Sequence, residues 1–248
     1  MSALLFSAPP PNEERYEVHI QLCKEKFDFV FPMFYSTIKR IFNINAQKYD
    51  YELFESSFSR MIRLHDLGKL TRKWQDRINP YKPPLPSHST LGAAYLWKTL
   101  PYGIKEPVSF AVAIHHTDRG LLGDNIEKPD VQAILDVIVD NNGNINWHDE
   151  VEKVGGDYFP EDAKKFKLSD LKDMARGLRI WSKGCALLEQ HQRRIQASLA
   201  HHILKLCDVS AGTERNEYKK KDEQDYYGGW LMVENIHNYV ENIKQRGI

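Results

Sequence analysis

Apolar side chains recur at helical spacing along residues 50–66, and this segment ends on two ionisable residues, His65 and Asp66. The side chains that share one face of such a helix are Phe54, Phe58, Met61, Ile62 and His65. Gly68 follows as a helix stop. Burying an aspartate is costly unless it is paired or bound to a metal ion. The pattern therefore predicts a helix that carries a polar site at its buried end.

The rest of the chain also has mainly helical patterns. Predicted helices cover residues 13–31, 88–99, 107–116, 129–140, a long stretch from 169 to 212 that can break near 184, and a last one ending near 245. Turn signals in residues 141–165 predict a surface excursion that can hold a short β-hairpin, and residues 213–229 predict an exposed loop. No repeat or linker stands out, so we expect one all-helical domain over residues 1–248.

Charge and cysteine content exclude several classes of protein. The 34 basic and 34 acidic residues balance, which argues against nucleic-acid binding by bulk charge alone. No apolar run approaches the roughly 18 residues of a membrane helix, and the N-terminus lacks the features of a signal peptide. We expect a cytoplasmic protein that does not contact membranes. Its three cysteines are interpreted as reduced packing thiols: Cys23, Cys185 and Cys207.

Further histidines and a further aspartate repeat the pattern seen at His65. His115 and His116 end an apolar run that begins at Val108, His88 stands at the first turn of its predicted helix, and Asp208 closes an apolar helix end. Imidazole nitrogen combined with carboxylate oxygen suits Mn²⁺, Fe²⁺, Co²⁺, Ni²⁺ or Zn²⁺, with Mg²⁺ the less favoured choice. No cysteine pair of a zinc finger and no His-Glu-x-x-His motif accompanies these residues.

Residues 65–69, His-Asp-Leu-Gly-Lys, resemble the His-Asp-x-Gly-Lys signature of the HD phosphohydrolase superfamily. The upstream His19 is similar to the first metal ligand of that family, and Asp208 is similar to its last. His88 and the pair 115–116 resemble the additional ligands of its binuclear branch. The resemblance implies an all-α, HD-domain helical bundle and metal-dependent hydrolysis of phosphate esters.

The same resemblance implies a ligand set for two divalent cations. The first would be held by His19, His65, Asp66 and Asp208, and the second by Asp66, His88, His115 and His116. Asp66 would bridge the two, because a carboxylate has two oxygens. Paired cations are a general means of cleaving phosphodiesters. We expect Asp66 and Lys69 to be catalytic, with Lys69 contacting a phosphate oxygen; a salt bridge from Lys69 to Asp66 is the alternative.

Two groups of the binuclear branch compete as the nearest resemblance. Residues 88–93, His-Ser-Thr-Leu-Gly-Ala, and the double histidine are similar to the CRISPR-associated HD nuclease of type I interference, which can be a separate polypeptide. Cyclic dinucleotide phosphodiesterases of the HD-GYP type also have a double histidine, but the sequence contains no Gly-Tyr-Pro. The resemblance thus implies a nuclease acting on single-stranded DNA. The sequence has no phosphate-binding helicase loop, so the helicase and the guide-RNA complex would be other chains.

Four more residues are candidates for lining the path of the nucleic acid. Arg72, Lys73 and Arg119 could contact phosphates, and Trp74 could stack on a base. Two alternative functions remain open at the level of sequence. One is a phosphodiesterase for cyclic dinucleotides or nucleotides, and the other is a metal-stabilised subunit that docks within a larger complex.

Overall fold

The structure is a computed structural model that describes residues 5–8, 13–43, 49–78, 81–82, 85, 88–116, 139–183, 186–219 and 231–246. Its helices are α1 (Tyr16–Phe42), α2 (Tyr51–Leu64), α3 (Arg72–Ile78), α4 (Ser89–Thr99), α5 (Lys105–Ala113), α7 (Leu168–Lys183), α8 (Leu187–Lys219) and α9 (Leu231–Gln245). Three short 3-10 helices are η1 (Leu67–Leu70), η4 (Asp149–Lys153) and η5 (Glu161–Lys165). The strands β1 (Phe6–Ala8) and β2 (Glu14–Arg15) pair antiparallel, with Phe6 opposite Arg15. The predicted all-α fold is confirmed.

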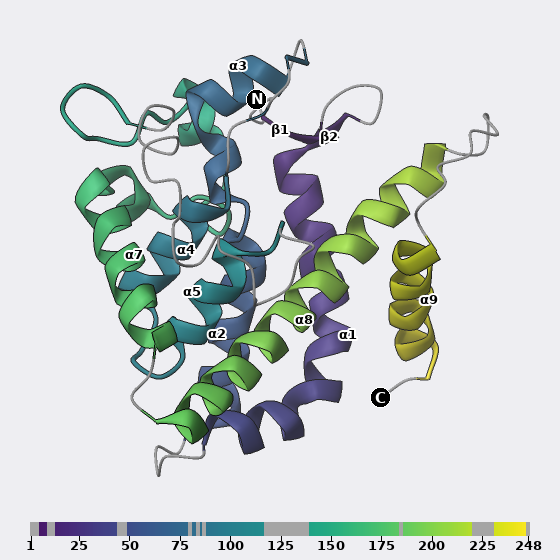
Figure 1. The fold of residues 1–248 in the computed structure, drawn as a ribbon. Helices are drawn as coiled ribbons and strands as arrows, with labels where there is room; N and C mark the ends of the chain where they lie inside the picture. The colour runs from purple at the N-terminus through teal and green to yellow at the C-terminus, as the bar shows by residue number, and fades with distance from the viewer. Residues whose placement is uncertain are drawn as a thin grey trace.

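The long helix α8 runs diagonally across the molecule and packs against α1, α5 and α9 (Figure 1). Helices α4 and α5 pack on each other, and α7 covers α4 on the side away from α9. The predicted apolar face of α2 is fully buried in the core, through Phe54, Phe58, Met61 and Ile62. Among the described helices, none is both long and apolar enough to cross a membrane.

Two helices extend beyond their predicted ends. Helix α1 continues to Phe42 with Pro32 inside it, because buried side chains such as Ile38 extend its apolar face past the proline. Helix α8 continues through Gly212 to Lys219, so the prediction of a loop at 213–219 is wrong. A glycine inside a helix costs about 1 kcal/mol, and packing of α8 against α9 offsets that cost.

The excursion at 141–165 forms no strand anywhere in residues 139–183, all of which are described. The predicted hairpin is reduced to an isolated antiparallel bridge between Val139 and Ile145, around a turn in which Gly143 has a φ of +78°. The short sheet lies instead at the N-terminal end, where it was not predicted. The predicted helix at 129–140 lies outside the described residues except for 139 and 140, which are not helical, since Val139 belongs to this bridge.

Two glycines let the His-Asp turn lie directly against the start of α4. A Cβ atom on Gly68 would lie 2.2 Å from the carbonyl oxygen of His88, and one on Gly92 would lie 2.3 Å from the carbonyl oxygen of Leu64. Both neighbours are backbone atoms, which cannot rotate away. The glycines therefore fix the distance between the end of α2 and His88.

We expect Gly68→Ala to lower the free energy of unfolding by about 2 kcal/mol, because the added methyl group overpacks a backbone contact. Urea denaturation followed by circular dichroism measures this change. Gly156→Ala is the matched control, since a Cβ there would meet nothing within 4 Å. Equal stability of the two variants would show that the close approach at Gly68 is not required.

Candidate metal centre

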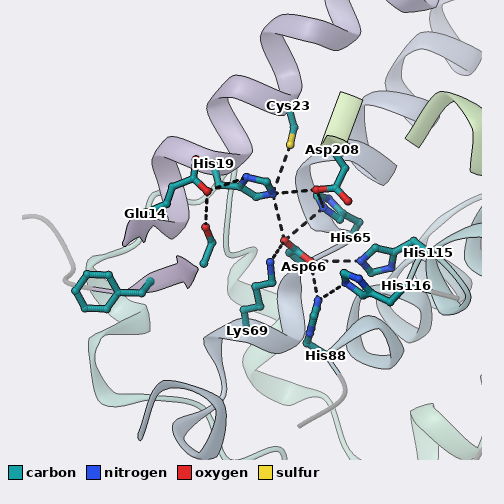
Figure 2. Close-up of polar contacts among 12 residues, drawn as sticks. Glu14, His19, Cys23, His65, Asp66, Lys69, His88, His115, His116 and Asp208 are labelled. Carbon is teal, nitrogen blue, oxygen red and sulfur yellow. Dashed lines mark hydrogen bonds and ion pairs between the residues drawn. The ribbon is translucent and has the colours of Figure 1, made fainter. Parts of the chain in front are cut away.

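Six elements and turns of the chain meet at one buried cluster of histidines and carboxylates (Figure 2). Helix α1 provides His19, the turn after α2 provides His65 and Asp66, and η1 provides Lys69. His88 precedes α4, His115 and His116 follow α5, and Asp208 comes from α8. Every residue predicted as a metal ligand is thus part of this cluster.

The carboxylate of Asp66 lies at the centre, and its two oxygens face different histidines. Its Oδ2 is 3.4 Å from the Nε2 of His19 and 3.4 Å from the Nε2 of His65. Its Oδ1 is 3.1 Å from the Nε2 of His88 and 3.5 Å from the Nε2 of His115. The side chain is only 1% exposed. Each oxygen of this buried carboxylate therefore faces two imidazole nitrogens.

Backbone contacts fix the orientation of two of these imidazoles. The Nδ1 of His65 donates to the carbonyl of Ile62 at 2.8 Å, and the Nδ1 of His115 donates to that of Val112 at 2.6 Å. A carbonyl can only accept, so each neutral ring carries its proton on Nδ1 and presents a lone pair on Nε2. Among the described residues, neither Nε2 has a hydrogen-bond partner. Both lone pairs face the carboxylate of Asp66, so the donor set fits a bound cation.

His19 is held between carboxylates on both sides. Its Nε2 is 3.2 Å from Asp208 Oδ1, and its Nδ1 is 3.1 Å from Glu14 Oε2, which also accepts a hydrogen bond from Ser7 Oγ. Burial by itself lowers the pKa of His19, but Cys23, Asp208 and Asp66 outweigh it and raise that pKa well above its ordinary value. The local potential is therefore strongly negative, which favours any cation.

The other half of the cluster consists of the imidazoles of His88, His115 and His116 near Asp66 Oδ1. The Nε2 atoms of His88 and His116 are 2.6 Å apart. Burial lowers the pKa of His88 to about 4, and burial together with His115 and His88 lowers the pKa of His116. A neutral imidazole has the free lone pair that a metal ligand needs. The ligand atoms of these three histidines and Asp66 lie within 4.8 Å of one another.

Lys69 forms a salt bridge with Asp66, which the sequence analysis gave as the alternative to a contact with phosphate. Its Nζ lies 2.6 Å from Asp66 Oδ2 and 5.7 Å from the centre of the Trp74 ring. Burial by itself would raise the pKa of Asp66, but the basic side chains around it, His65 and Lys69 foremost, hold that pKa well below its usual range. The central carboxylate is therefore ionised. A contact between Lys69 and a phosphate stays a prediction.

Of the four residues predicted to line the path of the nucleic acid, Trp74 cannot have the predicted role. Its side chain is 2% exposed and packs edge to face against His88, so the prediction that it stacks on a base is wrong. Arg72 is partly exposed and forms an ion pair with Asp149. Lys73 is partly buried on α3, and Arg119 lies outside the described residues.

Two residues of the cluster were missed by the sequence analysis. Cys23 lies one helical turn after His19, with its Sγ 3.6 Å from His19 Nε2, although the sequence assigned it to packing. Its spacing of four residues from a candidate ligand was the signal for it. Glu14 stands in β2, outside any helical pattern, so no periodicity could connect it to the cluster.

No protein-family model matches this sequence, and no curated protein matches it. The fold is similar to that of a solved structure, the CRISPR-associated Cas3 HD domain protein MJ0384 from Methanocaldococcus jannaschii, with a TM-score of 0.60 and 16% sequence identity. The similarity covers 82% of this chain and 99% of that chain. The chain has the HD-domain fold.

We expect Glu14→Gln to weaken metal binding by about tenfold or more, because carboxylates that orient a ligand histidine contribute that much to metal affinity. Competition with a chromogenic chelator measures the dissociation constant. Glu25→Gln is the control. Glu25 is an exposed residue further along α1, and its side chain accepts a hydrogen bond from Gln21. An unchanged affinity in Glu14→Gln would show that Glu14 does not support His19.

Proposed function

We propose that this chain is a metal-dependent nuclease of CRISPR interference that hydrolyses single-stranded DNA. One observation carries the proposal: the two oxygens of the buried Asp66 carboxylate face two different groups of histidines. We also propose that residues 1–248 act as a single HD domain and that a separate helicase and a guide-RNA complex deliver the DNA.

The cluster would hold two divalent cations on opposite sides of Asp66. His19, His65 and Asp208 would complete one set of ligands, and His88, His115 and His116 the other. Cations bound there would supply Lewis acidity, polarising the phosphate oxygens and offsetting the negative charge that develops during hydrolysis. The mixed nitrogen and oxygen donors favour Mn²⁺, Co²⁺, Ni²⁺, Fe²⁺ or Zn²⁺ over Mg²⁺.

The residues of this chain would contribute mainly through their fixed positions. The carbonyls of Ile62 and Val112 hold two imidazole rings in the orientation that aims Nε2 at the cluster. Lys69 neutralises part of the charge on Asp66, and we propose that it also contacts a phosphate oxygen of the substrate. Because these groups are held before the substrate binds, little reorganisation is needed during the reaction.

The choice of DNA over a cyclic dinucleotide depends on two supporting observations. The sequence lacks the Gly-Tyr-Pro of the HD-GYP enzymes. The solved structure with the same fold is described as a CRISPR-associated Cas3 HD domain protein. Both favour a role in CRISPR interference for this chain as well.

Purified protein stripped of metal and reloaded with Mn²⁺, Ni²⁺, Co²⁺ or Mg²⁺ should degrade single-stranded DNA. Asp66→Asn should reduce the rate of DNA cleavage by at least about 100-fold, because it removes the shared anionic ligand while keeping the shape of the side chain. Gel analysis of labelled oligonucleotides measures the rate. Asp173→Asn, on the exposed surface of α7, should leave the rate unchanged.

The same preparations would be offered duplex DNA, RNA, a cyclic dinucleotide and a nucleoside triphosphate. Cleavage of the cyclic dinucleotide with intact DNA would replace the nuclease proposal by the phosphodiesterase alternative. Tight metal binding without any hydrolysis, also in the presence of a helicase partner, would favour the docking subunit.

We expect Lys69→Gln to reduce single-turnover DNA cleavage by about 100-fold, the loss typical of removing one fixed group that stabilises transition-state charge. Metal stoichiometry, measured by atomic emission, should not change. Lys153→Gln, at an exposed ion pair in η4, is the control. Loss of metal together with activity would instead assign Lys69 to the support of Asp66.

A further inference from the structure

We propose that Cys23 is a metal ligand, through its thiolate, in the half of the centre that contains His19, His65 and Asp208. This assignment rests on the metal-dependent function proposed above and goes beyond the ligand set implied by the HD resemblance. It would make one half of the centre selective for thiophilic cations such as Zn²⁺ and Co²⁺.

The first support is the position of the sulfur atom. Cys23 Sγ lies 3.6 Å from the Nε2 of His19, and one ligand atom from each of Cys23, His19, His65 and Asp208 lies within 4.8 Å of the others. In a tetrahedral site with bonds of about 2.0–2.3 Å, ligand atoms lie roughly 3.3–3.8 Å apart. The four donors are therefore nearly at the spacing that a single cation requires.

The second support is the set of lone pairs that converge on the same point. His65 Nε2 is fully buried, aimed at the cluster and, within the described part of the chain, without a hydrogen-bond partner. His19 Nε2 faces oxygens of Asp208 and Asp66 at 3.2 and 3.4 Å, distances at which one cation can bind all three atoms. Figure 2 shows the sulfur of Cys23 directed at the same nitrogen of His19. A cation is the partner that all of these atoms can share.

The third support is the comparison with Cys207. Both thiols are free and 0% exposed, as expected for cysteines that only fill space. Cys23 differs because it lies four residues after His19 on α1, so that the two side chains project from the same face of the helix. Among the described residues, the groups that could hold a metal include Cys23 and do not include Cys207.

A thiolate ligand would divide the centre into two unlike halves. On binding a cation, the thiol of Cys23 would release its proton to solvent, and the sulfur would donate its electron pair to the metal. Thiolates favour Zn²⁺ and related cations, whereas Mn²⁺ and Mg²⁺ prefer oxygen ligands. Among the described residues, the half around His88, His115 and His116 has imidazole and carboxylate donors only. We infer a tightly held thiophilic cation beside His19 and a more exchangeable cation beside His88.

Titration of the metal-free full chain with Co²⁺ tests the assignment without measuring activity. Wild type should develop a sulfur-to-cobalt charge-transfer band in the near ultraviolet as well as the visible bands of bound Co²⁺. Cys23→Ser should lose the charge-transfer band and should bind Zn²⁺ at least about tenfold more weakly. A tenfold loss of affinity is about the smallest that follows removal of a group supporting a metal site. Cys207→Ser should retain both properties.

A second variant keeps the test decisive if Cys23→Ser does not fold. In Cys185→Ser/Cys207→Ser, Cys23 is the only cysteine left, and the charge-transfer band must remain at full intensity. Visible Co²⁺ bands without any charge-transfer band in this variant would overturn the assignment of Cys23 while leaving the metal centre intact. A wild-type chain that binds no Co²⁺ at all would overturn the proposed function itself.

Discussion

The buried carboxylate of Asp66 is the constraint on which the rest of the site depends. An ionised aspartate that is 1% exposed is stable only when positive charge and hydrogen-bond donors surround it. Lys69 provides one fixed charge, and the imidazoles provide nitrogen atoms that can hold more positive charge in the form of cations. Asp66 also contributes, after Cys23 and Asp208, to the raised pKa of His19. A cation bound at this cluster would therefore also stabilise the core around it.

The scaffold around Asp66 is built from backbone contacts as much as from side chains. Gly68 and Gly92 allow the chain to approach closely between the end of α2 and the start of α4, and Ser89 Oγ donates to the carbonyl of Ala113 at the end of α5. Backbone carbonyls fix the rings of His65 and His115. Rigid contacts of this kind set the positions of the ligand atoms before any ion binds, which is a requirement for a selective site.

The two sides of Asp66 differ in their chemistry although both contain imidazoles. Carboxylates and a thiol surround His19, whereas burial keeps His88 and His116 neutral. A strongly negative side is suited to retaining a cation, and a neutral side is suited to exchanging one or to sharing it with an anionic phosphate. This asymmetry is consistent with a hydrolase in which one cation is permanent and the other is close to the substrate.

The sequence by itself determined the helical architecture and most members of the central cluster, because helix periodicity places a buried face and a motif marks its polar end. It could not determine which atoms meet. The carbonyl anchors of His65, the approach of Glu14 from β2 and the direction of Cys23 depend on contacts between distant segments. The burial of Trp74 was missed for the same reason, since no local pattern shows what covers a side chain. Only the packing of α1, α4, α5 and α8 around one turn decided that these residues share a single point in space.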